Sequence, residues 1–257
     1  MFLTRAERRR VRRRRRLFLL FAAVIALAAI ASALDHTHAR SRHRSRIPSP
    51  GTSMATRAPS AKPAKKRAPP TAPGTAIGTA LGWADFHGLR LPQSAESGPR
   101  HRRGGLAWGF ADTQEGALLA AVNIAVRTGA QWGPNIYQPT IRHQVTGPDA
   151  AALLKVDADG YAALRAAAHV RPGQPAGRGY AVEAGFRFVA FTPADATVDI
   201  VTEGPGSGGT TVRTATRVEV VWLRGDWRAV APPGGDWANS ATAVSSLTGY
   251  TTFPNEE

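Results

Sequence analysis

The residues best suited to acid–base chemistry are two histidines and the carboxylates of predicted strands. His143 and His169 fall in predicted helical segments, where a neutral imidazole can serve as a general base. A lone histidine near a helix end more often contacts a carbonyl group or solvent, so neither receives a catalytic role. The absence of cysteine from the sequence excludes thiolate catalysis and Cys-based zinc sites.

The carboxylates on the predicted strands fall opposite an apolar stripe. Residues 180–191 alternate, with Phe186 on one face and Glu183 and Arg187 on the other. The following strands add further charges to that second face: Asp199, Arg213, Arg217 and Glu219. We expect a solvated cross-strand charge ladder, each pair contributing less than about 1 kcal/mol. Since a general base must lie on the pocket side, we predict no catalytic, cofactor-binding or metal-binding residue and no cofactor.

Two short motifs resemble ligand loops without meeting their requirements. Residues 157–160 read Asp-Ala-Asp-Gly but lack the later glutamate of a calcium loop, so they predict a helix break. Residues 204–209 read Gly-Pro-Gly-Ser-Gly-Gly but lack the lysine of a phosphate loop, so they predict a hairpin connection. The sequence therefore favours a non-enzymatic protein.

The spacing of apolar residues changes along the chain, and it predicts the helices and strands that position these residues. Residues 83–110 read as an irregular lead-in with turn residues, and a helix follows from Asp112, a predicted cap, to Gly129. A short segment at 135–144 and a helical region at 148–169 come next. After Pro172 apolar residues recur at every second position. This spacing predicts strands at 180–191, 196–203, 210–223 and 227–231 and an edge element near 244–250. Helices followed by an antiparallel meander predict an α+β domain.

Three tryptophans lie in predicted irregular regions. Outside the predicted helices and strands lie Trp83, Trp108 and Trp237. In contrast, Trp222 falls on the apolar face of a predicted strand. Aromatic side chains are enriched at the centres of protein interfaces. The three tryptophans are therefore a predicted partner surface.

The charge is concentrated at the N-terminus. Residues 1–75 carry 18 Lys and Arg against two acids, and residues 76–257 carry 15 against 16, so the two parts have charges of +16 and −1. A nucleic-acid-binding domain would need its basic residues on the folded part. Nucleic acid is therefore not the predicted partner.

An apolar run follows the first arginines. It begins at Leu17 and ends at Leu34, contains no charge, and would span about 27 Å as a helix, close to the hydrocarbon thickness of a membrane. A signal peptide is the alternative, because residues 31–33 resemble a cleavage site. The nine arginines of residues 1–16 place the N-terminus in the cytoplasm and the C-terminal domain outside.

Residues 35–79 predict a disordered linker. They are rich in Pro, Ala and basic residues and have few bulky apolar ones, so burial cannot offset the entropy of ordering them. The domain organisation is then a tail at 1–16, a span at 17–34, the linker, and an extracytoplasmic domain at 80–257. The basic tail and linker would contact anionic lipid or cell wall.

The helices, long hairpins and closing Val-Trp-Leu-Arg-Gly-Asp-Trp at 221–227 resemble the cystatin-like cone of NTF2-like domains. With one N-terminal span, the chain resembles the VirB8/TcpC-type subunits of conjugative transfer systems. The motifs Leu-Pro-Gln-Ser at 91–94 and Gly-Phe-Ala-Asp-Thr-Gln-Glu-Gly at 109–116 resemble membrane proteins of actinobacterial integrative elements.

This resemblance implies an assembly subunit of a conjugation or secretion apparatus, acting by contact with other subunits or with copies of itself. An exported NTF2-like domain that binds or hydrolyses a small ligand is the alternative, and a cell-wall-associated stress or sporulation protein is a third reading. The resemblance implies no functional residues for this chain.

Overall fold

The computed structural model describes residues 81–179 and 181–254. They belong to the second of the two units into which the chain divides, residues 76–257. The predicted tail, apolar span and linker, and also Tyr180, lie outside the described residues. Within the two described ranges, every helix is too short or too polar to cross a membrane.

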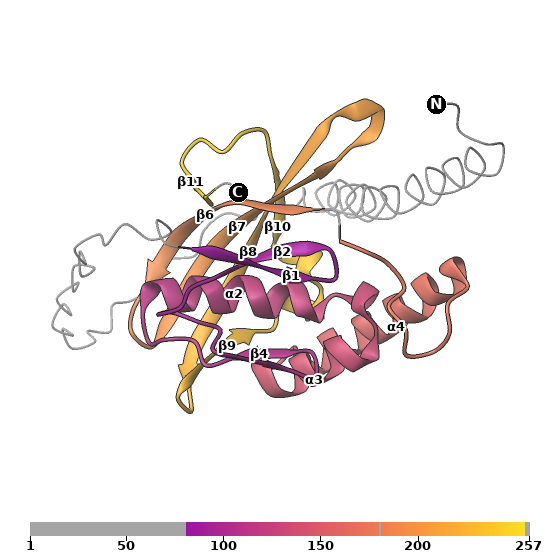
Figure 1. The fold of residues 1–257 in the computed structure, drawn as a ribbon, viewed down its shortest axis with the longest axis horizontal. Coiled ribbons are helices and arrows are strands. Elements are labelled where there is room, and N and C mark those ends of the chain that lie inside the picture. The colour runs from indigo at the N-terminus through magenta and orange to yellow at the C-terminus, as the bar shows by residue number, and fades with distance from the viewer. Residues whose placement is uncertain (1–80, 180, 255–257) are drawn as a thin grey trace, which may run out of the picture. The chain divides into compact units, whose positions relative to one another are not determined.

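A seven-stranded sheet is the framework of the described part (Figure 1). Its centre is an antiparallel meander of three long strands, β6 (Val182–Phe191), β7 (Asp195–Pro205) and β8 (Thr211–Leu223), followed by β9 (Asp226–Val230). The short strand β11 (Thr251–Thr252) pairs with β6, and β5 (Val145–Thr146) runs parallel to β9. The third short strand, β10 (Ala241–Val244), pairs with residues 213–216 of β8, whereas β9 pairs with residues 220–223 of the same strand. The predicted meander is confirmed.

Three helices precede the meander: α2 (Gln114–Thr128), α3 (Pro134–Gln144) and α4 (Ala150–Ala168). Short 3-10 turns accompany them and the later strands: η1 (Ala130–Trp132), η2 (Ser207–Gly209), η3 (Pro233–Gly235) and η4 (Trp237–Ser240). Figure 1 shows α2 crossing the long strands, and it packs on β7, β8 and β9. The predicted α+β class is confirmed.

The helix α2 is the centre of the hydrophobic core. Every residue from position 116 to position 124 is buried, because the sheet covers one side of α2 and β2 and β4 cover another. Leu118 and Leu119 are both fully buried, and each such side chain contributes about 1.5–3 kcal/mol. The helix ends at Gly129, as predicted.

The predicted irregular lead-in is wrong, because residues 82–108 form two antiparallel hairpins. The first joins β1 (Gly82–Phe86) to β2 (Leu89–Gln93), and the second joins β3 (His101–Arg103) to β4 (Leu106–Trp108). Strands of three to five residues are too short to show a period in sequence. Burial of Leu91 in the core holds β2 in place.

The predicted start of α2 and the predicted break in α4 are also wrong. The N-cap of α2 is Thr113, not Asp112, and its hydroxyl accepts a hydrogen bond of 3.0 Å from the Gly116 amide. The helix α4 runs unbroken through residues 157–160. A Cβ at position 160 would meet Ala130 at an ordinary contact distance of 3.4 Å, so close packing does not require glycine there.

A carboxylate joins the lead-in to the last long hairpin. Asp226 accepts hydrogen bonds from the amides of Gly109 (2.9 Å) and Phe110 (3.1 Å), and the Trp227 indole donates to the carbonyl of Ala111 (2.9 Å). Both residues are buried. These bonds fix the approach to α2 relative to β9, and they join residues 109–116 to residues 221–227, two of the three motifs on which the family resemblance rests.

Candidate functional site

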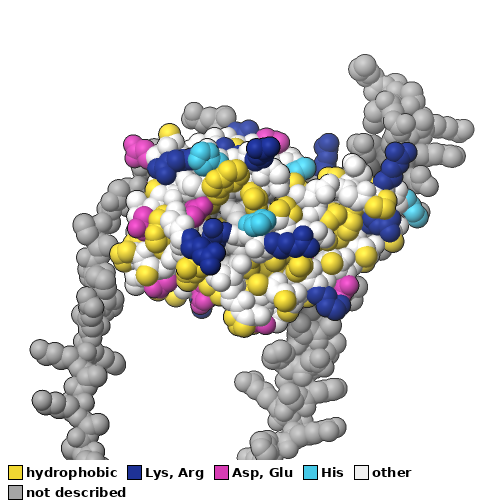
Figure 2. Space-filling view, turned by 90° about the horizontal axis from the view of Figure 1, so that it is seen from below, with side chains coloured by type: hydrophobic (Ala, Val, Ile, Leu, Met, Phe, Trp, Pro, Cys, Tyr) yellow, Lys and Arg dark blue, Asp and Glu magenta, His cyan; other side chains and the backbone are white. Residues whose placement is uncertain are grey.

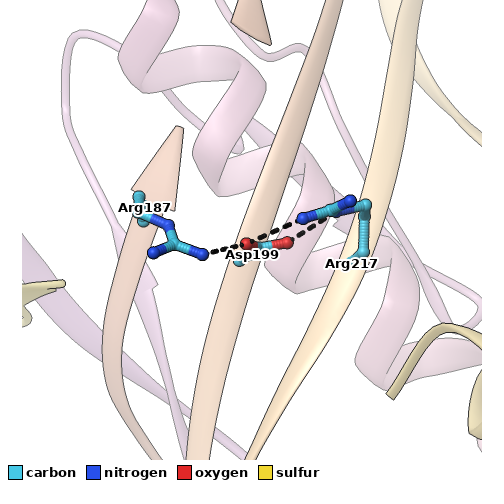
Figure 3. A network of polar contacts seen from close by, with 3 residues as sticks. All are labelled: Arg187, Asp199 and Arg217. Atoms are coloured by element: carbon cyan, nitrogen blue, oxygen red, sulfur yellow. Dashed lines mark hydrogen bonds and ion pairs between the residues drawn. The ribbon is translucent and has the colours of Figure 1, made fainter. Parts of the chain in front are cut away.

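Three residues form a row across the centre of the sheet (Figure 3). Asp199 of β7 lies in register with Arg187 of β6 and with Arg217 of β8. Arg217 binds both carboxylate oxygens, through Nε to Oδ1 (2.8 Å) and Nη2 to Oδ2 (3.1 Å). Arg187 donates from Nη2 to Oδ2 (2.7 Å). One acid therefore orients two guanidinium groups.

Burial and exposure are divided unevenly within this row. The Asp199 side chain is only 6% exposed, whereas those of Arg187 and Arg217 are 47% and 53% exposed. Burial alone would raise the pKa of Asp199, but hydrogen bonds from Arg217 and Arg187 outweigh it and the pKa is lowered. The same bonds raise the pKa of both arginines. The row carries a net charge of +1, and its cationic groups face solvent.

Further groups extend the row on the same face of the sheet. The guanidinium of Arg187 lies 4.7 Å from the ring centroid of Tyr250, which comes from the segment between β10 and β11. Arg213 of β8 forms an ion pair with Glu203 of β7, and Glu219 is exposed two residues after Arg217. We call Arg187, Asp199, Arg217, Glu219 and Tyr250 the arginine row surface. It confirms the predicted cross-strand charges, although Asp199 is buried rather than solvated.

Glu183 does not belong to that surface, and its predicted solvent position is wrong. A β-bulge between Glu183 and Gly185 shifts the register of β6 against β7, so Glu183 pairs with Thr202 and lies on the helix-facing side with Phe186. The side chain is buried, and its Oε2 has no hydrogen-bond partner within the described part. Burial raises the pKa of Glu183 to about 8.

A second buried carboxyl lies on α4. Asp157 has no partner for Oδ2 among the residues that the structure describes, and burial, followed by the nearby Asp236, raises its pKa to about 8. Burial also raises the pKa of the Tyr137 hydroxyl. Both buried acids are therefore protonated at neutral pH.

The two histidines considered as catalytic candidates, His143 and His169, form no site with Glu183 or Asp157. His143 is exposed in the last turn of α3, and His169 is exposed as the left-handed cap of α4 with φ of 54°. Within residues 81–179 and 181–254, no group of three His, Asp or Glu side chains is placed to hold a metal ion. The geometry brings together arginines and one acid rather than an acid–base pair.

The three predicted partner-surface tryptophans are half-buried and separate. Trp83 packs on the core beside Phe253, and Trp108 contacts His101 at a ring distance of 5.3 Å. The Trp237 indole donates to the Thr128 hydroxyl (2.9 Å). In the part of the chain that the structure describes, no ring contact joins these three residues, so a shared tryptophan patch remains a prediction.

Comparison with known proteins gives one family. Residues 40–252 match the family model described as a domain of unknown function, DUF8175. The chain belongs to this family. No curated protein and no solved structure matches the chain. The family match contains the whole arginine row surface and also Glu183 and Asp157.

Tyr250 is the member of the arginine row surface that the sequence did not reveal. Its contact with Arg187 depends on the last segment of the chain returning across β6, which β11 fixes through its pairing with Gly185 and Phe186. The signal available in the sequence was the edge element predicted near residues 244–250. That prediction did not specify which strand the element would join.

Proposed function

We propose that this chain is a non-enzymatic, membrane-anchored assembly subunit of a conjugative transfer or secretion apparatus. Its N-terminus would lie in the cytoplasm, and an NTF2-like domain outside the membrane would act by contact with other subunits or with copies of itself. The apolar run that begins at Leu17 supports the anchor. The long antiparallel strands with α2 packed on them support the fold proposal.

The arginine row surface is the observation that carries the contact role. Arginine and tyrosine are enriched among the residues that dominate binding energy at protein interfaces. Asp199 holds Arg187 and Arg217 in one geometry before any partner binds. Ordering side chains in advance reduces the entropy lost on association. A partner that presents acidic groups to the two arginines and a basic group to the exposed Glu219 fits this surface best.

The experiment reverses a charge beside the row without breaking it. Glu219 is exposed, and no hydrogen bond or ion pair of its side chain holds the described fold, so Glu219→Arg should fold normally. Expressed as the full chain in a strain deleted for it, Glu219→Arg should lower the transfer frequency of the element that encodes it by about tenfold. Glu96→Arg makes the same charge change at an exposed position on another segment and should leave transfer unchanged.

Membrane levels of both variants are measured by immunoblotting, so that a loss of protein is recognised. Transfer that does not depend on the chain at all would contradict the proposed apparatus. Equal transfer by the two variants at equal protein levels would contradict the contact role of this surface.

A small-ligand-binding or hydrolytic domain is the second candidate, and Glu183 favours it. A protonated carboxyl on the helix-facing side of a sheet is the kind of group that serves as a general acid. If this function is correct, Glu183→Gln should abolish the phenotype of the chain while Glu219→Arg preserves it. The opposite result favours the assembly role.

A further inference from the structure

The hairpin of β3 and β4 carries a run of basic residues with no acid beside it. Residues 97–111 contain three arginines and one histidine and no Asp or Glu. All three residues of β3 are exposed, and so is Arg100 before them. Because residues 76–257 together have a charge of −1, the hairpin is a local concentration of positive charge on a nearly neutral domain.

The pairing of β3 with β4 divides these side chains between two faces. Side chains alternate along a strand, so Arg102 lies on the face opposite to His101 and Arg103. Its Nη2 donates to Gln93 of β2 (2.5 Å), and its pairing partner Ala107 is fully buried in the core. The face of Arg102 is therefore turned toward the body of the protein, and His101 and Arg103 point away from it.

The outward face combines these two residues with two large apolar side chains. His101 pairs with Trp108, and Arg103 pairs with Leu106. The rings of His101 and Trp108 lie 5.3 Å apart between centroids, with an interplanar angle of 31°. Both Leu106 and Trp108 are only half-buried. We call His101, Arg103, Leu106 and Trp108 the hairpin surface.

Helix α3 lies beside β4 at the border of the hairpin surface. Gln144 at its end donates from Nε2 to the carbonyl of Ala107 (2.6 Å). The helix contains no acid, and Arg142 and His143 are exposed in its last turn. Figure 2 views the molecule from the side on which β4 and α3 lie in Figure 1, and Lys or Arg and His side chains lie among hydrophobic ones on this face.

This combination of side chains fits the surface of an anionic membrane. Tryptophan is enriched at the boundary between membrane and water, where its ring lies at the level of the headgroups. Arginines near the surface are attracted to anionic lipid. Amphipathic surfaces bind the interface through both effects, apolar burial and attraction to the headgroups. The hairpin surface presents both kinds of side chain on one face.

The proposed anchor would keep this face close to a bilayer. With residues 17–34 in the membrane, residues 35–80 connect the span to the described domain. Even when fully extended, a connection of that length reaches only about 150 Å. Contact between the domain and the bilayer is then an intramolecular event with a high effective concentration. A few side chains therefore suffice to populate it.

We propose that the hairpin surface binds the anionic headgroup layer of the membrane in which the chain is anchored. Arg103 pairs with lipid phosphate, and Trp108 and Leu106 enter the boundary between headgroups and acyl chains. This inference rests on the membrane anchor of the proposed function. Because β4 packs on α2, on the other side of the sheet from the arginine row surface, the contact leaves that surface free for a protein partner.

The test uses the six tryptophans, all of which lie in residues 83–237 and none in the predicted tail, span or linker. The full chain is reconstituted in vesicles of phosphatidylglycerol or phosphatidylcholine whose acyl chains are brominated near the headgroup. Bromine quenches tryptophan fluorescence only at short range, so quenching reports contact of the domain rather than of the anchor. Quenching should be stronger in phosphatidylglycerol, and Trp108→Phe should remove most of the difference.

Arg103→Gln removes a cation from the same surface without changing a tryptophan. The equilibrium constant for contact, obtained from the quenched fraction, should fall about fivefold. Arg178→Gln is the matched control, because it makes the same charge change at an exposed position between α4 and β6, and it should leave quenching unchanged. Added salt should weaken the contact of the wild-type chain through screening. Circular dichroism checks the fold of each variant.

Flotation of the same vesicles after a high-salt wash separates this contact from the anchor. A chain that does not float with phosphatidylcholine has no anchor, which contradicts the proposed function and this inference together. A chain that floats but is quenched equally in the two lipids, or equally in Arg103→Gln and Arg178→Gln, overturns the lipid contact alone. Loss of element transfer in Arg103→Gln without quenching in the wild type would assign the hairpin surface to an acidic protein partner and also overturn it.

Discussion

Glu183 and Asp199 lie on adjacent strands of one sheet, and both are buried. Asp199 receives three hydrogen bonds from two arginines, and its pKa is lowered. Glu183 has an oxygen without a partner in the described part of the chain, and its pKa is raised to about 8. Burial without a partner raises the pKa of Glu183, whereas the hydrogen bonds from the two arginines outweigh burial at Asp199 and keep it charged.

The two acids therefore make folding depend on pH in opposite ways. The lowered pKa of Asp199 means that its contribution is present above its unfolded pKa and is lost as pH falls through the folded value. The raised pKa of Glu183 means that the unfolded chain releases this proton first, from about pH 4.5 upward, while the folded chain retains it to about pH 8. Stability falls with rising pH across that interval.

The largest expected effect is this alkaline loss, to which Asp157 contributes in the same direction. Between pH 5 and pH 8.5 the free energy of unfolding should fall by several kcal/mol, since each pKa unit corresponds to about 1.4 kcal/mol. Glu183→Gln should remove roughly half of the fall, and Glu183→Gln with Asp157→Asn should remove most of it. Urea denaturation followed by tryptophan fluorescence at each pH measures the change. An equal slope in the wild type and the double variant would show that the acids are not the cause.

The next effect concerns the paired acid. Asp199→Asn leaves Arg187 and Arg217 without their anion and should lower the free energy of unfolding at pH 7 by about 2 kcal/mol, as expected for lost hydrogen bonds to a charged group. Asp112→Asn makes the same chemical change at an exposed turn position and should have an effect below about 0.5 kcal/mol. Urea denaturation of both variants tests the difference. Equal losses of unfolding free energy in the two variants would show that the ion pairs of Asp199 do not stabilise the fold.

The smallest expected effect separates the two arginines. Arg217 makes two hydrogen bonds to Asp199 and Arg187 makes one, so Arg217→Gln should cost more than Arg187→Gln. Because both side chains are half-exposed, the loss for Arg217→Gln should stay at or below about 1 kcal/mol. Thermal denaturation of the pair at low and high salt measures the order. A larger loss for Arg187→Gln would indicate that its contact with Tyr250 outweighs the second bond of Arg217.

The sequence predicted the face on which Asp199 and Arg217 lie but not the face on which Glu183 lies, for one physical reason. Side chains alternate regularly between the two faces along β7 and β8, so Asp199 and Arg217 lie on the faces that their positions predict. In β6 a bulge adds one residue between Glu183 and Gly185, so the side chains before it point to the opposite face from the one that alternation predicts. The only local signal among residues 182–185 is Gly185, since an isolated glycine within a strand often marks a bulge.

Residues 82–108 and helix α4 are two further places where local sequence did not predict the structure. The hairpins at residues 82–108 are held by burial of Leu91 against α2 and by the hydrogen bonds that the amides of Gly109 and Phe110 donate to Asp226, which is more than a hundred residues away in sequence. Asp157 and Gly160 weaken a helix locally, but packing against η1 and η3 keeps α4 continuous. Contacts distant in sequence decided both outcomes.

The sequence by itself determined the uneven charge, the α+β order of elements and the strand meander, because periodicity and composition are local properties. Tertiary structure alone decided which acids are charged, since a carboxyl group's pKa depends on the neighbours that folding brings to it. It also placed the buried Arg127 guanidinium 4.3 Å from the ring centroid of Phe86. That contact exists only because the β1–β2 hairpin folds against α2.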